Sequence, residues 1–168
     1  MIEIPLSQGK FALVDDDEQV QWKWSAYQDK YTFYATRHVL HPVTGRRTTI
    51  RMHRAIMGVT DPRIQVDHID LNGLNNQRHN LRIATHGQNQ QNHRVRQDNT
   101  SGYKGVSWNR ESSKWAAYII DGHKIHLGYF TDPEEAARVY DRAAILHFGE
   151  FARLNFEEIH ESEQASGE

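Results

Sequence analysis

The residues that could do chemistry are concentrated in one polar stretch, residues 66–92. Asp67 and His68 are adjacent, Asn80 follows His68 by twelve residues, and Asn89 lies nine residues further on. Carboxylate and carboxamide oxygens are hard ligands suited to Mg²⁺ or Mn²⁺. A neutral histidine beside such a metal can take a proton from water, because its pKa lies near neutral pH. Since the metal would neutralise charge developing on a phosphate, the set suits phosphodiester hydrolysis.

A structural interpretation of the same stretch stays open. A loop rich in Asn and His can satisfy its own hydrogen bonds through Asx turns, which account for many asparagines. The chain has no cysteine, which excludes disulfides, thiolate catalysis and Cys-ligated zinc. We interpret the nearby His79, His86 and His93 as phosphate contacts or surface residues rather than metal ligands.

Local patterns predict how these residues come together. The segment that ends at Asp67 and His68 reads as a strand, and residues 81–84 read as its return strand after an Asn-Gly turn. Thr85 then begins a helix through a Ser/Thr-x-x-Gln capping box, and Asn89 lies about one turn into that helix. A strand end and a helix face would therefore meet across a short hairpin.

This stretch resembles the HNH endonuclease motif in its His-Asn-Asn form, with agreement in spacing, order and flanking residues. Met52–Gly58 (MHRAIMG) resembles the helix that precedes the motif in phage and intron-borne members. The resemblance implies a ββα-metal fold. The site residues that it implies are the metal ligands Asp67 and Asn89, the general base His68, Asn80 as the residue that braces the loop and orients His68, and Arg78 or Arg82 as contacts to the scissile phosphate.

Residues 101–156 differ in character. Three strand-like runs, two of them joined by Asp121-Gly122, precede a helix that Asp132-Pro133 should begin and Gly149 should end. The motifs KWAA, LG and EEAARVYD in this segment resemble the plant ethylene-response-factor, or Apetala-two, DNA-binding domain. In that family a three-stranded sheet lies in the major groove of DNA.

Residue by residue, the resemblance implies a DNA-reading face. Its members would be Lys104, Ser107, Lys114, Tyr118, Ile120, Lys124 and His126, with Trp108 or Arg110 nearby. The chain departs from the family here, because Lys, Ser or Ile replaces several family arginines and His126 replaces a tryptophan. Lysine reads guanine less rigidly than arginine does. We therefore expect DNA binding with a target unlike the plant one; a packing module that binds a protein or nothing is the alternative.

Charge is segregated along the chain, although the net charge is only −2. Residues 35–100 carry ten arginines, four aspartates and no lysine, whereas residues 155–168 carry five glutamates and no base. Arginine suits bidentate phosphate contacts. A solvated charged face is the alternative interpretation of the arginine block.

The organisation that we predict has two modules and a tail. Residues 1–98 would form the nuclease module, with a β-rich extension over 1–60 and the ββα-metal motif over 61–95. Residues 101–156 would form the DNA-binding domain, and 157–168 an acidic tail. A small core in the extension is expected from its aromatic residues, which are Trp22, Trp24, Tyr27, Tyr31, Phe33 and Tyr34.

The sequence thus predicts an α+β protein: a ββα-metal HNH nuclease module with an N-terminal β extension, plus a three-stranded antiparallel sheet packed on one helix. The expected function is a Mg²⁺- or Mn²⁺-dependent endonuclease that nicks double-stranded DNA, as in phage homing endonucleases. The alternatives are a DNA-binding transcriptional regulator with a vestigial nuclease site and a nuclease that acts on RNA. No membrane segment and no secretion signal is expected. The family resemblance implies a phage or mobile element, and with it the cytoplasm of a bacterial or phage-infected cell.

Overall fold

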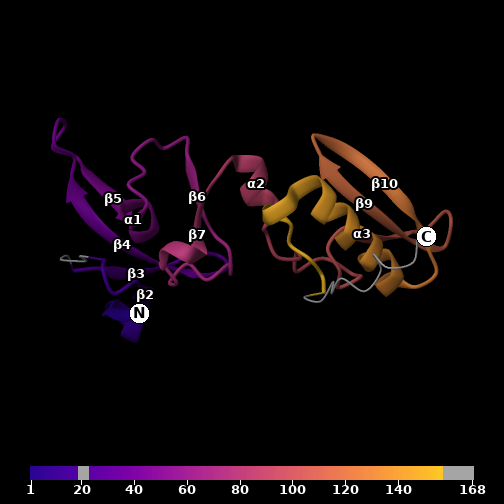
Figure 1. Ribbon diagram of the computed structural model, residues 1–168, viewed down its shortest axis with the longest axis horizontal. Coiled ribbons are helices and arrows are strands. Elements are labelled where there is room, and N and C mark those ends of the chain that lie inside the picture. Colours follow the sequence, from indigo (N-terminus) through magenta and orange to yellow (C-terminus); the bar gives the residue numbers. More distant parts are fainter. Residues whose placement is uncertain (19–22, 157–168) are drawn as a thin grey trace, which may run out of the picture. The chain divides into compact units, whose positions relative to one another are not determined.

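The computed structural model describes residues 1–18 and 23–156, and in these ranges the protein is a mixed α+β structure with small antiparallel sheets (Figure 1). The α+β class is therefore confirmed. The chain forms two compact units, Met1–Gln90 and Gln91–Glu168. The predicted acidic tail and Trp22 lie outside the described residues. No described helix is long and apolar enough to cross a membrane.

The first unit begins with two antiparallel sheets and a short helix. One sheet pairs β1 (Ile2–Pro5) with β2 (Phe11–Val14), after a 3-10 turn η1 (Ser7–Gly9). The other has the order β3-β4-β5, formed by β3 (Ser25–Gln28), β4 (Phe33–Leu40) and β5 (Arg47–Arg51). Helix α1 (Met52–Ile56) follows β5 directly.

The core of this part is made mostly of small side chains rather than a set of aromatic rings. Its buried members are Ala12, Val14, Trp24, Ala35 and Met52. Of the aromatic residues predicted for it, Trp24 is buried, whereas Tyr27 and Tyr31 are about half exposed. Tyr27 lies on β3, which is an edge strand of its sheet, so it has few neighbours to cover it.

A hairpin followed by a helix completes the first unit. Strand β6 (Gln65–His68) pairs with β7 (Leu81–Ala84), and the 3-10 turn η2 (Arg78–Asn80) leads into β7. Helix α2 (His86–Gln91) then begins with the predicted capping box. The Gln88 amide donates to Thr85 Oγ1 over 3.2 Å, and the Thr85 amide donates to Gln88 Oε1 over 2.9 Å. Local sequence therefore determines where α2 begins.

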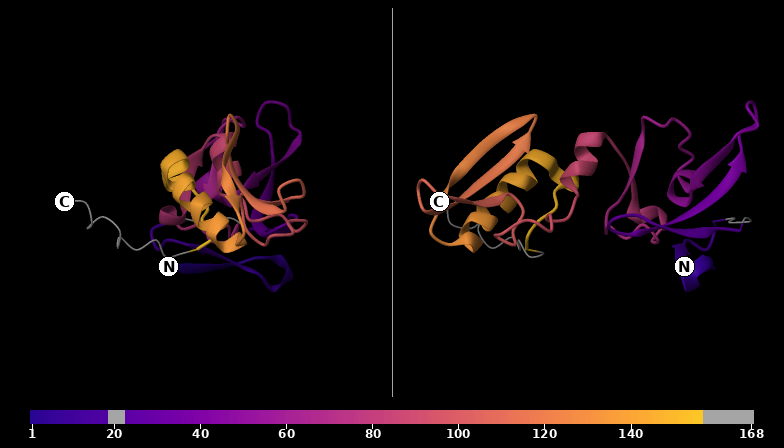
Figure 2. Two further views of the ribbon diagram at one scale, coloured as in Figure 1. Left: turned by 90° about the vertical axis from the view of Figure 1, so that its right-hand side faces the viewer. Right: turned by 180° about the vertical axis from the view of Figure 1, so that it is seen from behind.

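The second unit is a three-stranded sheet covered on one face by a long helix (Figure 2). The strands β8 (Val106–Asn109), β9 (Lys114–Asp121) and β10 (His123–Phe130) have the order β10-β9-β8. Helix α3 (Pro133–Phe148) is followed by the 3-10 turn η3 (Gly149–Phe151). The predicted helix start is confirmed, because the Glu134 amide donates to Asp132 Oδ1 over 3.0 Å.

Alanines let α3 lie close to the sheet. Ala136, Ala137 and Ala144 are fully buried, and Val106, Ala117 and Ile119 face them from the strands. Trp115, Phe130 and Phe156 pack against the same core.

Candidate active site

Asp67 and His68 end strand β6, and both residues are 5% exposed. Directly opposite Asp67 on β7 lies Arg82. Its Nε and Nη2 groups donate to Asp67 Oδ2 over 3.0 and 2.9 Å, and its side chain is only 10% exposed. The arginine predicted to contact a scissile phosphate is therefore a buried partner of the aspartate.

Arg78, the other predicted phosphate contact, lies at the surface of the loop. Its side chain is 54% exposed, and its Nε lies 2.5 Å from Glu18 Oε1. Its backbone amide donates to Asp15 Oδ2 over 2.7 Å, and this hydrogen bond is the main reason why the pKa of Asp15 is lowered. These contacts join the loop before β7 to the segment after β2.

His68 is held by an asparagine that the sequence did not single out. Its Nε2 lies 3.4 Å from Oδ1 of Asn76, which is completely buried. Because Asn76 uses its Nδ2 to donate to Leu74 O, the oxygen facing His68 is an acceptor. Nε2 therefore carries the proton, and Nδ1 is the basic atom of the neutral ring. Burial lowers the pKa of His68, which favours that neutral form.

Asn80 braces the loop between β6 and β7. Its Nδ2 donates to Asp70 Oδ1 over 2.9 Å and to Asn75 O over 2.8 Å, and its Oδ1 accepts from the Asp70 amide over 3.0 Å. Asn76 contacts His68 directly, and the orienting role of Asn80 stays a prediction. Asn76 is positioned in turn by β2, since its amide donates to Leu13 O.

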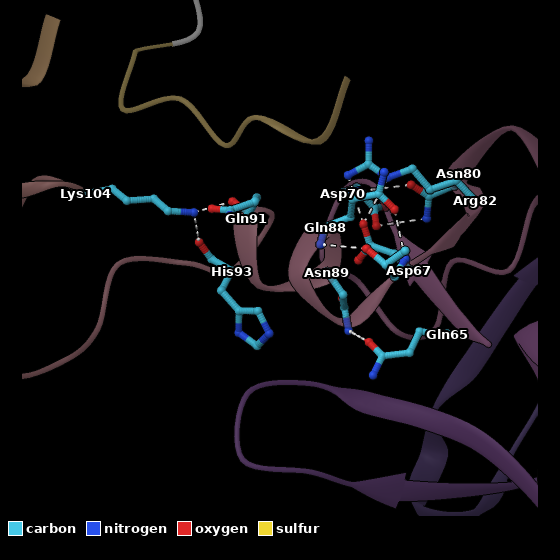
Figure 3. A network of polar contacts seen from close by, with 11 residues as sticks. Gln65, Asp67, Asp70, Asn80, Arg82, Gln88, Asn89, Gln91, His93 and Lys104 are labelled. Atoms are coloured by element: carbon cyan, nitrogen blue, oxygen red, sulfur yellow. Dashed lines mark hydrogen bonds and ion pairs between the residues drawn. The ribbon is translucent and has the colours of Figure 1, made fainter. Parts of the chain in front are cut away.

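Asn89 reaches the same face of the hairpin as Asp67. Its Nδ2 donates to Oε1 of Gln65 over 2.7 Å. Gln65 and Asp67 are two residues apart on β6, so their side chains leave the strand on the same side. Figure 3 shows Asp67, Gln65 and Asn89 grouped beside α2. Asn89 thus contacts β6 through Gln65, and its convergence with Asp67 and His68 on a metal stays a prediction.

The two oxygen donors suit a small hard cation. Asn89 uses its amide nitrogen on Gln65, and its Oδ1 and the Asp67 carboxylate are the oxygen atoms predicted to bind a metal. Among the described residues, no group of three or more His, Cys, Asp or Glu side chains could hold a metal ion. A cation bound here would therefore take the rest of its ligands from water and phosphate oxygens, as Mg²⁺ commonly does.

Two rings that the sequence did not mark as functional, buried His53 and partly buried Tyr34, lie beside His68. The ring of His53, from α1, lies 4.8 Å from the ring of His68, and Tyr34 lies 5.9 Å from it. Burial lowers the pKa of His53 to about 2, with a further contribution from His68. His53 is therefore uncharged at neutral pH, and its ring packs against the ring of His68.

The predicted DNA-reading residues are mostly on the open face of the second sheet. Strand pairing places Ser107 opposite Ala116, His126 opposite Tyr118, and Lys124 opposite Ile120, while the alternate residues pack on α3. Lys114, opposite Asn109, shares this open face. The Lys124 Nζ lies 4.0 Å above the ring of Tyr118.

Three predicted members of the DNA-reading face lie either on the opposite side of the sheet or outside its strands. Trp108 lies opposite Trp115 on the side of α3, with 5.1 Å between the rings, although it is 46% exposed. Arg110 is exposed just after β8. Lys104 lies outside the strands, and its Nζ donates to backbone carbonyls of Gln91 and His93 (Figure 3).

Tyr129 is a member of the open face that the sequence comparison with the plant domain left out. It lies opposite Ala116, is 48% exposed, and its ring lies 4.4 Å from the ring of His126. The alternation of β10 could have indicated it, but a register shift between His126 and Gly128 changes the alternation at this point.

Comparison with known proteins supports a composite chain. No family model matches it. It is 34% identical over 152 residues to an uncharacterized HNH endonuclease of Acanthamoeba polyphaga mimivirus, covering 88% of this chain and 75% of the relative. It is 36% identical over 109 residues to Protein 3.8 of Escherichia phage T7, covering 64% and 89%.

A separate set of relatives matches a shorter stretch. APETALA2-like protein 2 of Oryza sativa is 43% identical over 58 residues, which is 34% of this chain and 13% of the plant protein. The ethylene-responsive transcription factor ERF010 of Arabidopsis thaliana is 42% identical over 69 residues, covering 39% and 37%. The resemblance to two families inferred from the sequence is thereby confirmed.

Proposed function

Because this chain belongs to the HNH endonuclease family, we propose that it is a metal-dependent endonuclease that hydrolyses phosphodiester bonds of double-stranded DNA. The observation that carries the proposal is the arrangement around His68: a buried, neutral imidazole next to Asp67, with Asn89 on the same face as that aspartate. We assign the hairpin β6–β7 and helix α2 to a ββα-metal module on these grounds.

Each side chain then has a defined task. Asp67 and Asn89 would hold a Mg²⁺ or Mn²⁺ ion, which supplies charge neutralisation at the phosphate. His68 accepts a proton from the attacking water at Nδ1, while Asn76 retains the Nε2 proton and fixes the ring. Asn80 keeps the loop between the strands in place through Asp70 and Asn75.

The expected product is a nick. One site of this kind meets one strand at a time, so a single protomer would leave the other strand intact. We also propose that the protein acts on DNA within a phage-infected bacterial cell, since one relative comes from a phage and no described helix crosses a membrane.

The nuclease proposal is tested with supercoiled plasmid in the presence of Mg²⁺ or of a chelator. Wild type should nick only with the metal, and His68→Ala should lower the nicking rate by about 100-fold or more while leaving plasmid binding unchanged. His79→Ala, an exposed histidine of the same unit, is the matched control and should keep full activity.

Two results would redirect the proposal. Plasmid binding without nicking under Mg²⁺ and Mn²⁺ would identify a DNA-binding regulator with a vestigial site, which the similarity to plant transcription factors would then explain. Cleavage of RNA but not of plasmid would reassign the substrate.

DNA binding by the second unit is tested on the open sheet face. Lys124→Ala should weaken binding and lower the salt slope by about one unit, because one phosphate contact is lost. Arg142→Ala removes an exposed positive charge from α3 and should leave the slope unchanged. An unchanged slope for Lys124→Ala would remove this residue from the interface.

A further inference from the structure

The second unit contains a cavity of about 260 Å³ that neither the catalytic site nor the open sheet face includes. Three basic side chains line it: Arg94, Lys104 and Arg153. Its remaining lining residues are uncharged, so no carboxylate from the described part of the chain faces these cations in the cavity. Such a concentration of one sign of charge favours an anion.

Lys104 is a fixed part of the cavity wall. Its backbone amide donates to Asn155 Oδ1 over 2.6 Å, and its carbonyl accepts from Asn155 Nδ2. Buried Asp141 holds Asn155 in turn, over 2.9 Å. The Nζ of Lys104 donates to the carbonyls of Gln91 and His93 (Figure 3), which uses two of its three N–H groups.

The charge of Lys104 has no acidic partner there. Burial and, to a smaller extent, the nearby charge of Arg153 together lower its pKa to about 8. A partly buried ammonium group beside another cation is stabilised when an anion binds, because the anion offsets both the desolvation of the charge and the repulsion between the cations.

The two arginines are available for such an anion. Arg138 in the same unit is occupied, since its Nη2 lies 2.7 Å from Glu134 Oε1. For Arg94 and Arg153, the described residues provide no ion pair and no hydrogen bond. A guanidinium group binds phosphate oxygens with a pair of parallel N–H groups, so two of them suit one tetrahedral oxyanion.

We propose that this cavity binds one phosphate group, held by Arg94 and Arg153 together with the Lys104 ammonium. The group is either a phosphodiester of the DNA backbone or a free phosphate. A backbone phosphate would give the second unit a sequence-independent grip on DNA in addition to its sheet face. The DNA form rests on the proposed DNA binding, whereas the phosphate form does not depend on it.

The experiment uses the full chain with His68→Ala and a chelator, so that no DNA is cut. Inorganic phosphate is titrated calorimetrically into this protein and into the same protein with Arg94→Ala and Arg153→Ala. Salt dependence of duplex binding is measured in parallel. Arg142→Ala in the same background controls for the loss of one positive charge outside the cavity.

We expect the double variant to lose phosphate binding and to show a salt slope lower by about one unit, which is about threefold less loss of affinity between about 50 and 200 mM salt. The loss should be the same for unrelated duplexes, as expected for a backbone contact. Circular dichroism should be unchanged, and Arg153→Lys should retain most of the binding because it keeps the charge.

The possible outcomes separate the two sources of phosphate. Loss of phosphate binding with an unchanged salt slope supports the site and makes free phosphate its ligand. Phosphate binding that persists in the double variant, or that is absent from the parent, with unchanged slopes would overturn the proposal. An equal fall in slope for Arg142→Ala would also overturn it, since general charge would then explain the effect. None of these results depends on nuclease activity.

Discussion

The ring of His53 lies edge-on to the ring of His68, with 4.8 Å between the ring centroids and 79° between the ring planes. Both residues are almost completely buried, and they come from helix α1 and strand β6 respectively. The residue that we propose as general base is therefore positioned from two directions: Asn76 fixes one nitrogen, and His53 limits the rotation of the ring.

Removing the His53 ring should lower the rate of nicking without weakening DNA binding. We expect His53→Ala to lower kcat for nicking by about 10- to 100-fold, because small displacements of a catalytic group are costly in rate. His53→Phe should restore most of the rate, since it keeps a ring edge against His68. Single-turnover nicking and plasmid binding would be measured together. A His53→Phe variant as slow as His53→Ala would show that the imidazole itself is needed.

The same histidine should make the first unit sensitive to acid. Below its ordinary pKa of 6.5, the unfolded chain takes up a proton at His53 that the folded chain refuses, because burial lowers the folded pKa to about 2. The contribution of His53 to the free energy of unfolding is therefore fully present above pH 6.5. It decreases as the pH falls below 6.5, by up to about 1.4 kcal/mol per pH unit.

Urea unfolding at about pH 7.5 and about pH 5 measures this dependence. His53→Gln should flatten it, and His79→Gln, which changes an exposed histidine, should leave it as in wild type. An equally steep dependence in His53→Gln would assign the acid sensitivity to another group.

Arg82 should be essential for stability only as long as Asp67 has no other cation. Arg82→Ala removes the arginine that pairs with the buried Asp67 carboxylate, which we expect to cost about 3–5 kcal/mol of unfolding free energy. Mg²⁺ should restore part of the loss, so its effect on the urea midpoint should be larger in Arg82→Ala than in wild type. The double variant Arg82→Ala/Asp67→Ala should be more stable than Arg82→Ala alone. Equal Mg²⁺ effects in both proteins would contradict cation binding at Asp67.

Gly105 provides a test of whether the second unit folds by itself. It has a φ of +74°, and an added Cβ would lie 1.9 Å from a ring carbon of Tyr140. Gly105→Ala should therefore destabilise the second unit by about 3 kcal/mol or more. Gly122→Ala shares the positive φ but meets nothing within 4 Å, so it should cost only about 1–2 kcal/mol. In urea unfolding we expect Gly105→Ala to unfold in two steps, the second unit first, while the first unit stays folded.

The parts of the structure that sequence predicts well are those that depend on neighbouring residues. The Asp132-Pro133 start of α3, its Gly149 end and the Thr85 cap of α2 are all confirmed. Strand alternation was sufficient to place Gln65, which Asn89 contacts, on the same side of β6 as Asp67.

Contacts between buried polar groups could not be predicted in the same way. The loop between β6 and β7 contains several asparagines, and which of them faces His68 depends on its attachment to β2, far away in the sequence. The partner of Arg82 likewise depends on strand register. The position of the Lys104 side chain depends on the path of the backbone at Gln91 and His93, whose carbonyls accept its hydrogen bonds. The resemblances to two families predicted a DNA contact for both side chains.

None of the strands β8, β9 and β10 contains an arginine. The guanidinium fork is the group that most often fixes a guanine edge, whereas lysine follows phosphates of any sequence. If this sheet binds DNA as we propose, its composition should tolerate point changes in the bound sequence. Such tolerance would allow the chain to bind its target after the target has mutated, but it would also reduce discrimination between related sites.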